Sequence, residues 1–167
     1  MITRDYCVLM ARYAQWMNTR LFGSVAGLSD AERRLDRGAF FGSIHETCNH
    51  LLWGDRIWLS RFTGTAFAVR NYGRGMIDDF DVLVRERAVT DRAILDWASS
   101  LDDEWLQGML TYTSAMDQRE RTLPRSLAVV HLFNHGTHHR GQLTALMTQA
   151  GLEPGITDLP FVPNAAA

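Results

Sequence analysis

The chain has 167 residues, 46% of them hydrophobic, which is enough apolar mass for one domain of ordinary size, residues 1–167, with its own core. Its formal net charge is only -2 and acidic and basic residues are mixed along it, so it lacks the charge distribution of a protein that binds nucleic acid directly. All 17 basic residues are arginines, which excludes lysine Schiff-base chemistry and a phosphate-binding P-loop.

The first half of the chain predicts two long helices. The first covers about Thr3 to Phe22, where apolar residues form a broad stripe, and Gly23 is expected to end it. A capping box, Ser29-Asp-Ala-Glu32, opens a short helical turn, and a loop is expected to follow. A second capping box starts the next long helix, about residues 43–62, whose apolar positions recur at helical spacing.

A third long helix is predicted from Phe80 to Ser99. The preceding residues 64–76 contain Gly and Arg without any period, and this loop is long enough to cover the mouth of a pocket. Asp78 and Asp79 supply the helix cap. Opposite charges at helical spacing are expected on its solvated face, in the pairs Asp81/Arg85, Arg87/Asp91 and Arg92/Asp96.

The remaining residues predict a hairpin and a final helix. Residues 101–105 favour a short helical turn, and residues 108–113 and 119–123 flank a polar turn as two short strands. The final helix lies between Pro124 and Gly151, and an extended, proline-spaced tail follows. The predicted fold is therefore all-α, an antiparallel four-helix bundle with a short β-hairpin before the last helix.

The cysteines and the hydropathy bear on the compartment. Cys7 and Cys48 are too few for a disulfide framework, and we expect both to be structural core residues in a reducing compartment. No apolar run reaches the roughly 18 residues of a membrane span, and the N-terminus lacks the apolar region of a signal peptide. We therefore expect a cytoplasmic protein without membrane contact.

Four of the six histidines lie in the final predicted helix. At about 100° per residue, His135 and His139 are about 40° apart and one turn from each other, so both imidazoles can converge on one ion. His131 extends this face by a turn, whereas His138 turns about 100° away from His139. A single histidine is usually a core or surface residue, but a core gains little from stacking ionisable rings. The pair therefore predicts a metal site.

The second helix carries His45-Glu46-Thr47-Cys48-Asn49-His50, which looks like the HExxH motif of zinc proteases until the spacing is counted. Its two histidines are five residues apart, about 140° round the helix, and cannot both reach one ion. His45 is expected to be solvated. His50 lies beside the apolar stripe, from which it could point into the centre of the bundle.

The sequence closely resembles the DNA-damage-inducible, DinB/YfiT-like family of four-helix-bundle metalloenzymes. The resemblance is carried by Asn134-His-Gly-Thr-His-His-Arg-Gly-Gln142, which is similar to the family signature NHGTxHRGQ, and by Asn49-His-Leu-Leu-Trp-Gly-Asp55. It implies that His50, His135 and His139 hold a divalent metal. It also implies a bundle of the up-up-down-down type that forms a homodimer.

Three neutral imidazoles suit zinc or nickel first, with iron, copper or manganese as alternatives. Cys48 lies about 200° from His50 on the helix and cannot easily serve as a fourth ligand, so the site is expected to be open. An open metal can lower the pKa of a bound water in a hydrolase, or hold a thiol as the thiolate. The resemblance favours the thiol, because relatives in the wider superfamily are S-transferases and isomerases that use low-molecular-weight thiols such as bacillithiol or mycothiol.

The expected function is that of a metal-dependent enzyme acting on a small-molecule substrate, a thiol-dependent S-transferase. The alternatives are a metal-dependent hydrolase and a non-catalytic stress-response protein that binds a metal or a ligand. The last stays open because only His131 and His138 could act as general bases near the three histidines. Five side chains could meet the carboxylate of a thiol cofactor or could simply be solvated: Arg70, Arg74, Asn134, Arg140 and Gln142.

Overall fold

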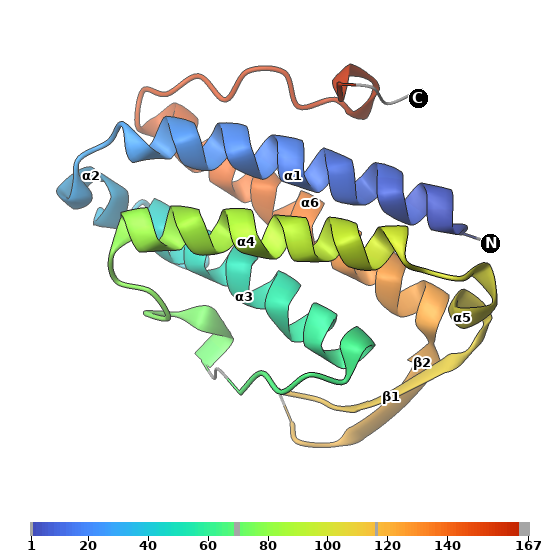
Figure 1. Cartoon of the computed structure of the whole chain (residues 1–167). Coiled ribbons are helices and arrows are strands. Elements are labelled where there is room, and N and C mark those ends of the chain that lie inside the picture. Colours follow the sequence, from blue (N-terminus) through green and yellow to red (C-terminus); the bar gives the residue numbers. More distant parts are fainter. Residues whose placement is uncertain (1, 69–70, 116, 164–167) are drawn as a thin grey trace.

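Four long helices make up the body of the protein, whose computed structural model describes residues 2–68, 71–115 and 117–163 (Figure 1). These helices are α1 (Arg4–Ala26), α3 (Ile44–Thr63), α4 (Phe80–Ser99) and α6 (Arg125–Gln149). The shorter elements are α2 (Asp30–Arg34), α5 (Asp103–Gln107), the 3₁₀ turns η1 (Asn71–Gly73) and η2 (Leu159–Phe161), and the antiparallel strands β1 (Met109–Thr113) and β2 (Glu120–Pro124). The predicted all-α fold with a hairpin before the last helix is confirmed.

The helices run up-down-down-up: α1 and α6 point one way, and α3 and α4 point the other (Figure 1). The most extensive contacts join α1 to α4 and α3 to α6, so each closely packed pair is antiparallel. The up-up-down-down order implied by the resemblance is wrong for this chain. The reason is the long connection of residues 64–79, which returns the chain to the end at which α3 begins, so that α4 runs parallel to α3.

The core has two apolar clusters separated by a buried polar layer. One cluster includes Phe62 of α3 and Leu132 of α6, and the other includes Leu21 of α1 and Leu143 of α6. Buried polar residues fall between the two clusters on α4 and α6: Arg87, Thr90 and Asp91 on α4, and His139 and Arg140 on α6. From the other two long helices, the buried residues Asn18, Asp55 and His50 contact Asp91, Arg87 and His139, respectively. The buried polar side chains therefore gather in the middle of the bundle.

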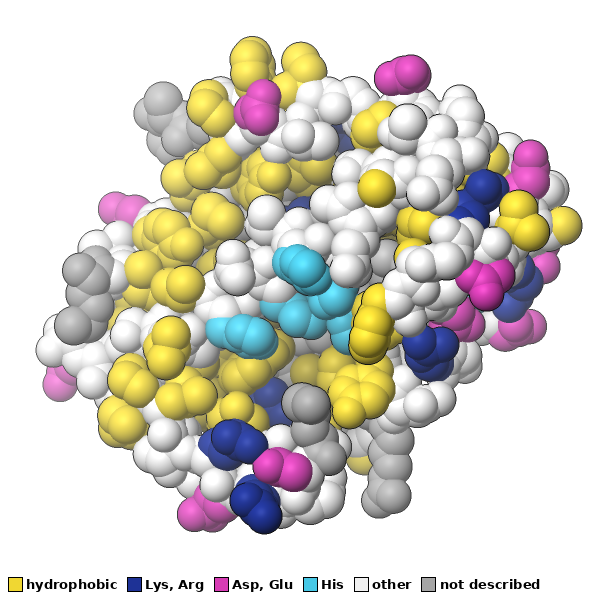
Figure 2. Space-filling view, turned by 180° about the vertical axis from the view of Figure 1, so that it is seen from behind, with side chains coloured by type: hydrophobic (Ala, Val, Ile, Leu, Met, Phe, Trp, Pro, Cys, Tyr) yellow, Lys and Arg dark blue, Asp and Glu magenta, His cyan; other side chains and the backbone are white. Residues whose placement is uncertain are grey.

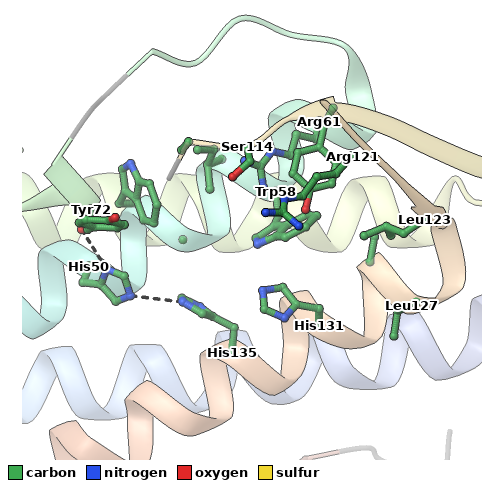
Figure 3. Close-up of a pocket in the computed structure, with 16 residues that line it drawn as sticks. His50, Trp58, Arg61, Tyr72, Ser114, Arg121, Leu123, Leu127, His131 and His135 are labelled. Carbon is green, nitrogen blue, oxygen red and sulfur yellow. Dashed lines mark hydrogen bonds between the residues drawn. The ribbon is translucent and has the colours of Figure 1, made fainter. Parts of the chain in front are cut away.

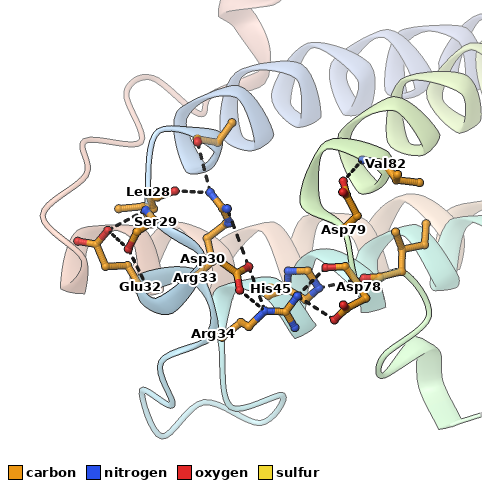
Figure 4. Close-up of polar contacts among 12 residues, drawn as sticks. Leu28, Ser29, Asp30, Glu32, Arg33, Arg34, His45, Asp78, Asp79 and Val82 are labelled. Atoms are coloured by element: carbon orange, nitrogen blue, oxygen red, sulfur yellow. Dashed lines mark hydrogen bonds and ion pairs between the residues drawn. The ribbon is translucent and has the colours of Figure 1, made fainter.

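The predicted caps are largely present (Figure 4). Ser29 and Glu32 form a reciprocal capping box at α2, and Asp79 accepts a hydrogen bond from the Val82 N–H at the start of α4. Ser43 caps α3, although the Glu46 carboxylate accepts from a distant backbone N–H instead of completing the box. The prediction that Gly23 ends the first helix is wrong: α1 continues to Ala26 because the next turn still buries a side chain, that of Val25.

Two predictions about solvated residues are also wrong. His45 is buried, and its Nε2 donates a hydrogen bond to the Ile77 carbonyl at 2.9 Å, because the chain before α4 folds over the start of α3. The Arg87/Asp91 pair is buried as well, since neighbouring helices supply polar partners that a single helix pattern does not reveal.

The predicted structural cysteines are buried, and no described helix has the length and apolarity to cross a membrane. Cys7 and Cys48 are free thiols with no exposed surface, and burial raises the pKa of both, that of Cys7 to about 11. Neither is a nucleophile at neutral pH. The absence of a spanning helix holds for residues 2–68, 71–115 and 117–163.

Candidate metal centre

Three imidazoles from two helices converge on one point in the polar layer. The Nε2 atom of His50 on α3 lies 3.2 Å from Nε2 of His135 and 3.1 Å from Nε2 of His139, both on α6. One nitrogen from each of the three rings lies within 4.8 Å of the others, a grouping that could hold a metal ion. The histidines gather on one face of the molecule (Figure 2), and the antiparallel packing of α3 on α6 brings them together.

The outer ring nitrogens of two of these histidines have hydrogen-bond acceptors. Nδ1 of His50 donates to the Tyr72 carbonyl at 2.9 Å, and Nδ1 of His139 donates to Oε1 of Gln142 at 2.8 Å. Each bond assigns the proton to Nδ1 and leaves the Nε2 lone pair directed inward. Such outer contacts fix the tautomer and the ring orientation of metal ligands in proteins.

The inward lone pairs fit a small divalent cation. Two neutral imidazoles that approach through unprotonated nitrogens at this separation repel each other unless a cation lies between them. A tetrahedral zinc ion with metal–nitrogen distances of about 2.0 Å would separate its ligand nitrogens by about 3.3 Å. The distances of 3.1 and 3.2 Å from His50 are close to this value. The donor set also matches the three-histidine sites of catalytic metals.

The protonation states agree with this arrangement. Burial lowers the pKa of His50 to about 4 and that of His135 to about 3, with the neighbouring imidazoles adding to the effect. Burial lowers the pKa of His139 too. All three rings are therefore neutral at pH 7, which is the form that binds metals.

Gly54 makes room for His135. A Cβ atom at this position would lie 2.5 Å from Cε1 of the His135 ring, closer than carbon atoms can approach. Gly54 follows His50 by one turn on α3, so it opens the helix surface where the partner helix inserts its ligand. The close approach of α3 and α6 at the site therefore requires glycine.

The segment around η1 supports His50, and Asn49 holds that segment in place. The Asn49 side chain both donates to the Ile77 carbonyl and accepts from the Ile77 N–H, each at 3.0 Å. Gly73 has a φ of +80°, and a Cβ there would lie 2.4 Å from that of Trp53, so the backbone next to Tyr72 also needs glycine. Asn49 thus holds in place the segment whose Tyr72 carbonyl accepts the hydrogen bond from the neighbouring candidate ligand, His50.

Phe41 and Arg74 cover one side of the site. The Phe41 ring stacks on the His50 ring with centroids 3.9 Å apart. Arg74 donates to the Phe40 carbonyl at 2.8 Å, and its guanidinium lies 5.4 Å from the Phe41 ring centre. Arg74, a candidate for binding a thiol carboxylate, is therefore occupied with holding this cover.

A pocket of about 650 Å³ opens beside the histidines (Figure 3). His50, His135 and His131 form one wall, and the other walls are largely aromatic, with Trp53, Trp58, Tyr72 and Tyr112. Arg61 and Arg121 also line it, whereas no Asp or Glu does so among the described residues. Its volume suits a small organic molecule.

The other residues considered as candidates lie outside the three-histidine group. His131 lies on the pocket wall with its ring 5.7 Å from that of His135, and Nε2 of His138 lies 3.3 Å from the Gln142 amide, so neither joins the three-histidine group. Arg140 is buried and donates to Thr137 in the core. Asn134 is exposed and does not line the pocket, and Arg70 lies outside the described residues.

Sequence reasoning missed Arg61, although a signal for it exists. His50, Gly54, Ile57 and Arg61 follow one another at steps of four, three and four residues, which places all of them on one face of α3. Extending the ligand's face along the helix would have indicated both the glycine gap and the arginine.

Comparison with known proteins identifies the family of the chain. The DinB family matches residues 1–166, a range that contains all three histidines. The protein named Protein DinB of Bacillus subtilis (strain 168) is 22% identical to the chain over 170 residues, which cover 92% of this chain and 91% of that protein. No solved structure matches. With a family match over almost its whole length, this chain belongs to the DinB family.

Proposed function

We propose that the protein binds one divalent metal ion, zinc or nickel, through His50, His135 and His139, and that it is an enzyme transferring a small thiol to an electrophilic small molecule. The observation that carries the proposal is the position of two converging histidines, His50 and His135, in the wall of an open pocket. A closed structural site would surround the ion with four protein ligands. Here three candidate ligands stand beside space for a substrate.

The side chains around the pocket have separate roles in this proposal. When bound, a divalent metal supplies a Lewis acid that lowers the pKa of a thiol or water that it coordinates. His50 and His139 are kept neutral and correctly turned by Tyr72 and Gln142. The aromatic walls bind the organic part of the substrate and reduce its contact with water.

The lack of a carboxylate in the described pocket lining favours thiol transfer over hydrolysis. Hydrolysis by an activated water usually employs a general base, such as the glutamate of metalloproteases, and in the described lining His131 is the one side chain outside the proposed ligands that could take this role. Thiol transfer needs none once the thiol has lost its proton to solvent: a sulfur–carbon bond forms, the bond to the leaving group breaks, and the leaving group departs as an anion with its electron pair. Hydrolysis therefore remains the lesser proposal.

The first test measures the metal content of protein purified without a histidine tag. We expect one divalent ion per chain, lost in His135→Ala and retained in His138→Ala, which also removes an α6 imidazole but whose ring faces Gln142. Equal metal content in both variants would show that the ligands are wrongly assigned.

The second test measures conjugation of chlorodinitrobenzene with a panel of small thiols. Metal-loaded protein should accelerate the reaction, and both metal removal and His135→Ala should abolish the acceleration. A variant on the exposed side of α6, Thr148→Ala, should react like the original protein. Metal-dependent thermal stabilisation without turnover for any thiol would instead favour the non-catalytic candidate, a stress-response protein that binds a metal or ligand.

The proposal keeps two expectations from the family resemblance, a homodimer and a cytoplasmic location. Sedimentation equilibrium tests the first, since a dimer has twice the chain mass of 18.9 kDa. Cell fractionation tests the second.

A further inference from the structure

We infer that Arg61 is an anion-binding residue in the pocket, and that the pocket takes a small aromatic molecule bearing a carboxylate, with its reactive carbon toward the histidines. The reaction of this molecule rests on the proposed function. Its binding does not, because Arg61 and the aromatic walls are present in the pocket whichever reaction takes place.

Arg61 extends over the aromatic wall of the pocket (Figure 3). It leaves the last turn of α3, and the centre of its guanidinium lies 4.4 Å from the Trp58 ring centre and 4.1 Å from that of Tyr112. Contacts with both rings hold the planar group in a fixed orientation. Arg61 is therefore preorganised within the pocket and does not extend freely into solvent.

This arginine has no carboxylate partner among the described residues, unlike two arginines of the neighbouring helix surfaces, Arg56 and Arg87. Arg56, one turn earlier on α3, pairs with Glu86, and Arg87 pairs with Asp55 and Asp91. Partial burial lowers the pKa of Arg61, and only the nearby Tyr112 opposes the effect. A partly desolvated guanidinium without an anion is an available fork of hydrogen-bond donors for one.

The positive charge of the pocket favours a negatively charged ligand. No Asp or Glu lines it in the described chain, whereas Arg61 and Arg121 both do, and a divalent ion at the histidines would add positive charge. Arg121 is half exposed and already pairs with Asp117 at 2.7 Å, which leaves Arg61 as the better site for a ligand carboxylate. An anionic molecule is favoured throughout such a pocket.

The rings that lie between the three histidines and Arg61 define the shape of the ligand. His131 lies with its ring centre 5.7 Å from that of His135 and 4.9 Å from that of Trp58, above which Arg61 is stacked. A flat, apolar body can lie along this row of rings and present one end to the histidines and the other to Arg61. An aromatic carboxylate meets both requirements.

The binding test compares naphthoate with the nearly isosteric but neutral naphthamide, using calorimetry on metal-loaded protein. Naphthoate should bind at least about tenfold more tightly, the preference expected of a charge-assisted hydrogen bond. In Arg61→Gln this preference should fall below about twofold while the affinity for naphthamide is unchanged. Arg85→Gln, which removes the same charge from an exposed position of α4, should keep the preference.

Two outcomes would overturn the inference. The first is equal binding of the two probes by the original protein. The second is a preference for naphthoate that survives in Arg61→Gln but disappears after metal removal, since the carboxylate would then bind at the histidines. Unchanged thermal stability of Arg61→Gln confirms that a lost preference does not reflect unfolding.

A kinetic comparison separates this inference from the proposed function. With chlorodinitrobenzoate as the electrophile, Arg61→Gln should raise KM about tenfold more than it does with chlorodinitrobenzene, with little change in kcat. If no electrophile reacts but naphthoate binds through Arg61, the proposed function fails and the anion site stands. If both electrophiles react equally well and the variant treats them alike, the anion site fails and the proposed function stands.

Discussion

The middle of the bundle contains two buried polar clusters that are built on opposite principles. In the first, the charge cluster, Arg87 lies 2.8 Å from both Asp55 and Asp91, and Asn18 donates to Asp91 at 2.8 Å. Each charge therefore has an opposite charge beside it. The cluster joins α1, α3 and α4, and burial is tolerable because Arg87 attracts both carboxylates and Arg140 adds a second positive charge near them.

The second cluster consists of the three histidines, which have no charged partner among the residues that the structure describes. The rings of His50 and His139 are positioned from outside by Tyr72 and Gln142, while their Nε2 atoms face each other with like polarity. Asp55 of the charge cluster and Gly54 of the histidine site are consecutive residues of α3. A buried cluster whose members attract one another thus holds helices together, whereas one whose members repel each other is prepared for a ligand.

Removing the positive charge of Arg87 should have a larger effect than any other substitution near the two clusters, and it should act on folding through the charge cluster. Arg87→Met leaves Asp55 and Asp91 buried without a counter-charge and should lower the free energy of unfolding by about 3–5 kcal/mol. Urea denaturation measures this, with the exposed Arg85→Met on the same helix as the control, expected within about 0.5 kcal/mol of the original. A loss below 1 kcal/mol would mean that the carboxylates are not held as charges.

A methyl group added at Gly54, where α3 contacts α6, should affect the histidine site and leave the charge cluster unchanged. Gly54→Ala forces His135 away from His50 and should weaken metal binding by about 100-fold, or about 2.7 kcal/mol. Competition with a chromogenic chelator measures the affinity. Gly23→Ala is the matched control, because no described atom lies within 4 Å of its added Cβ, and it should leave metal affinity unchanged. Tight metal binding by Gly54→Ala would contradict the geometry given for His135.

Acid should destabilise the metal-free protein through the histidines. Unfolded imidazoles bind protons below a pKa of about 6.5, whereas the folded pKa values are about 4 for His50 and about 3 for His135. The unfolded state therefore holds more protons as the pH falls from about 6.5, and the free energy of unfolding should decrease by up to about 1.4 kcal/mol per pH unit for each ring. Urea titrations between about pH 5 and 6.5 avoid most carboxylate titration.

A variant checks the source of that slope. His135→Phe removes one of the two rings, so its dependence on pH should be clearly shallower than that of the original protein. Identical slopes in the two proteins would attribute the acid sensitivity to other groups.

The smallest of these effects should come from the outer contact of His139. Gln142→Leu removes the acceptor that fixes the ring tautomer, and metal affinity should fall about tenfold, at the lower end of the usual range for such partners. Gln142→Glu restores an acceptor and should recover most of the loss. If both substitutions have the same effect, the role of Gln142 is steric and not one of hydrogen bonding.

Much of the fold follows from local patterns, and the errors come from tertiary neighbours. Apolar spacing and capping residues predict the long helices and the hairpin because these are properties of short segments. The burial of His45 depends instead on Ile77, 32 residues away, and that of the Arg87/Asp91 pair depends on Asn18 and Asp55 of other helices. One helix pattern contains no information about such partners.

The candidate site could likewise be predicted from the sequence only in part. The spacing of His135 and His139 on one helix is visible in the sequence, whereas the addition of His50 came from the family resemblance. The structure now brings it to within 3.2 Å of both. The roles of Gly54 and Tyr72 could not be predicted, since one consists of empty space and the other of a backbone carbonyl in an aperiodic loop.

The contact between His50 and His135 joins positions 85 residues apart, in the two helices that pack most closely on that side of the bundle. An ion held there would act as a reversible cross-link, closing a long loop much as a disulfide does, and its binding free energy would count toward folding. Chelation should then increase the rate at which proteases cleave the chain, because transient separation of α3 from α6 would no longer require release of the ion. In a cell, supply of the metal would set the lifetime of this protein.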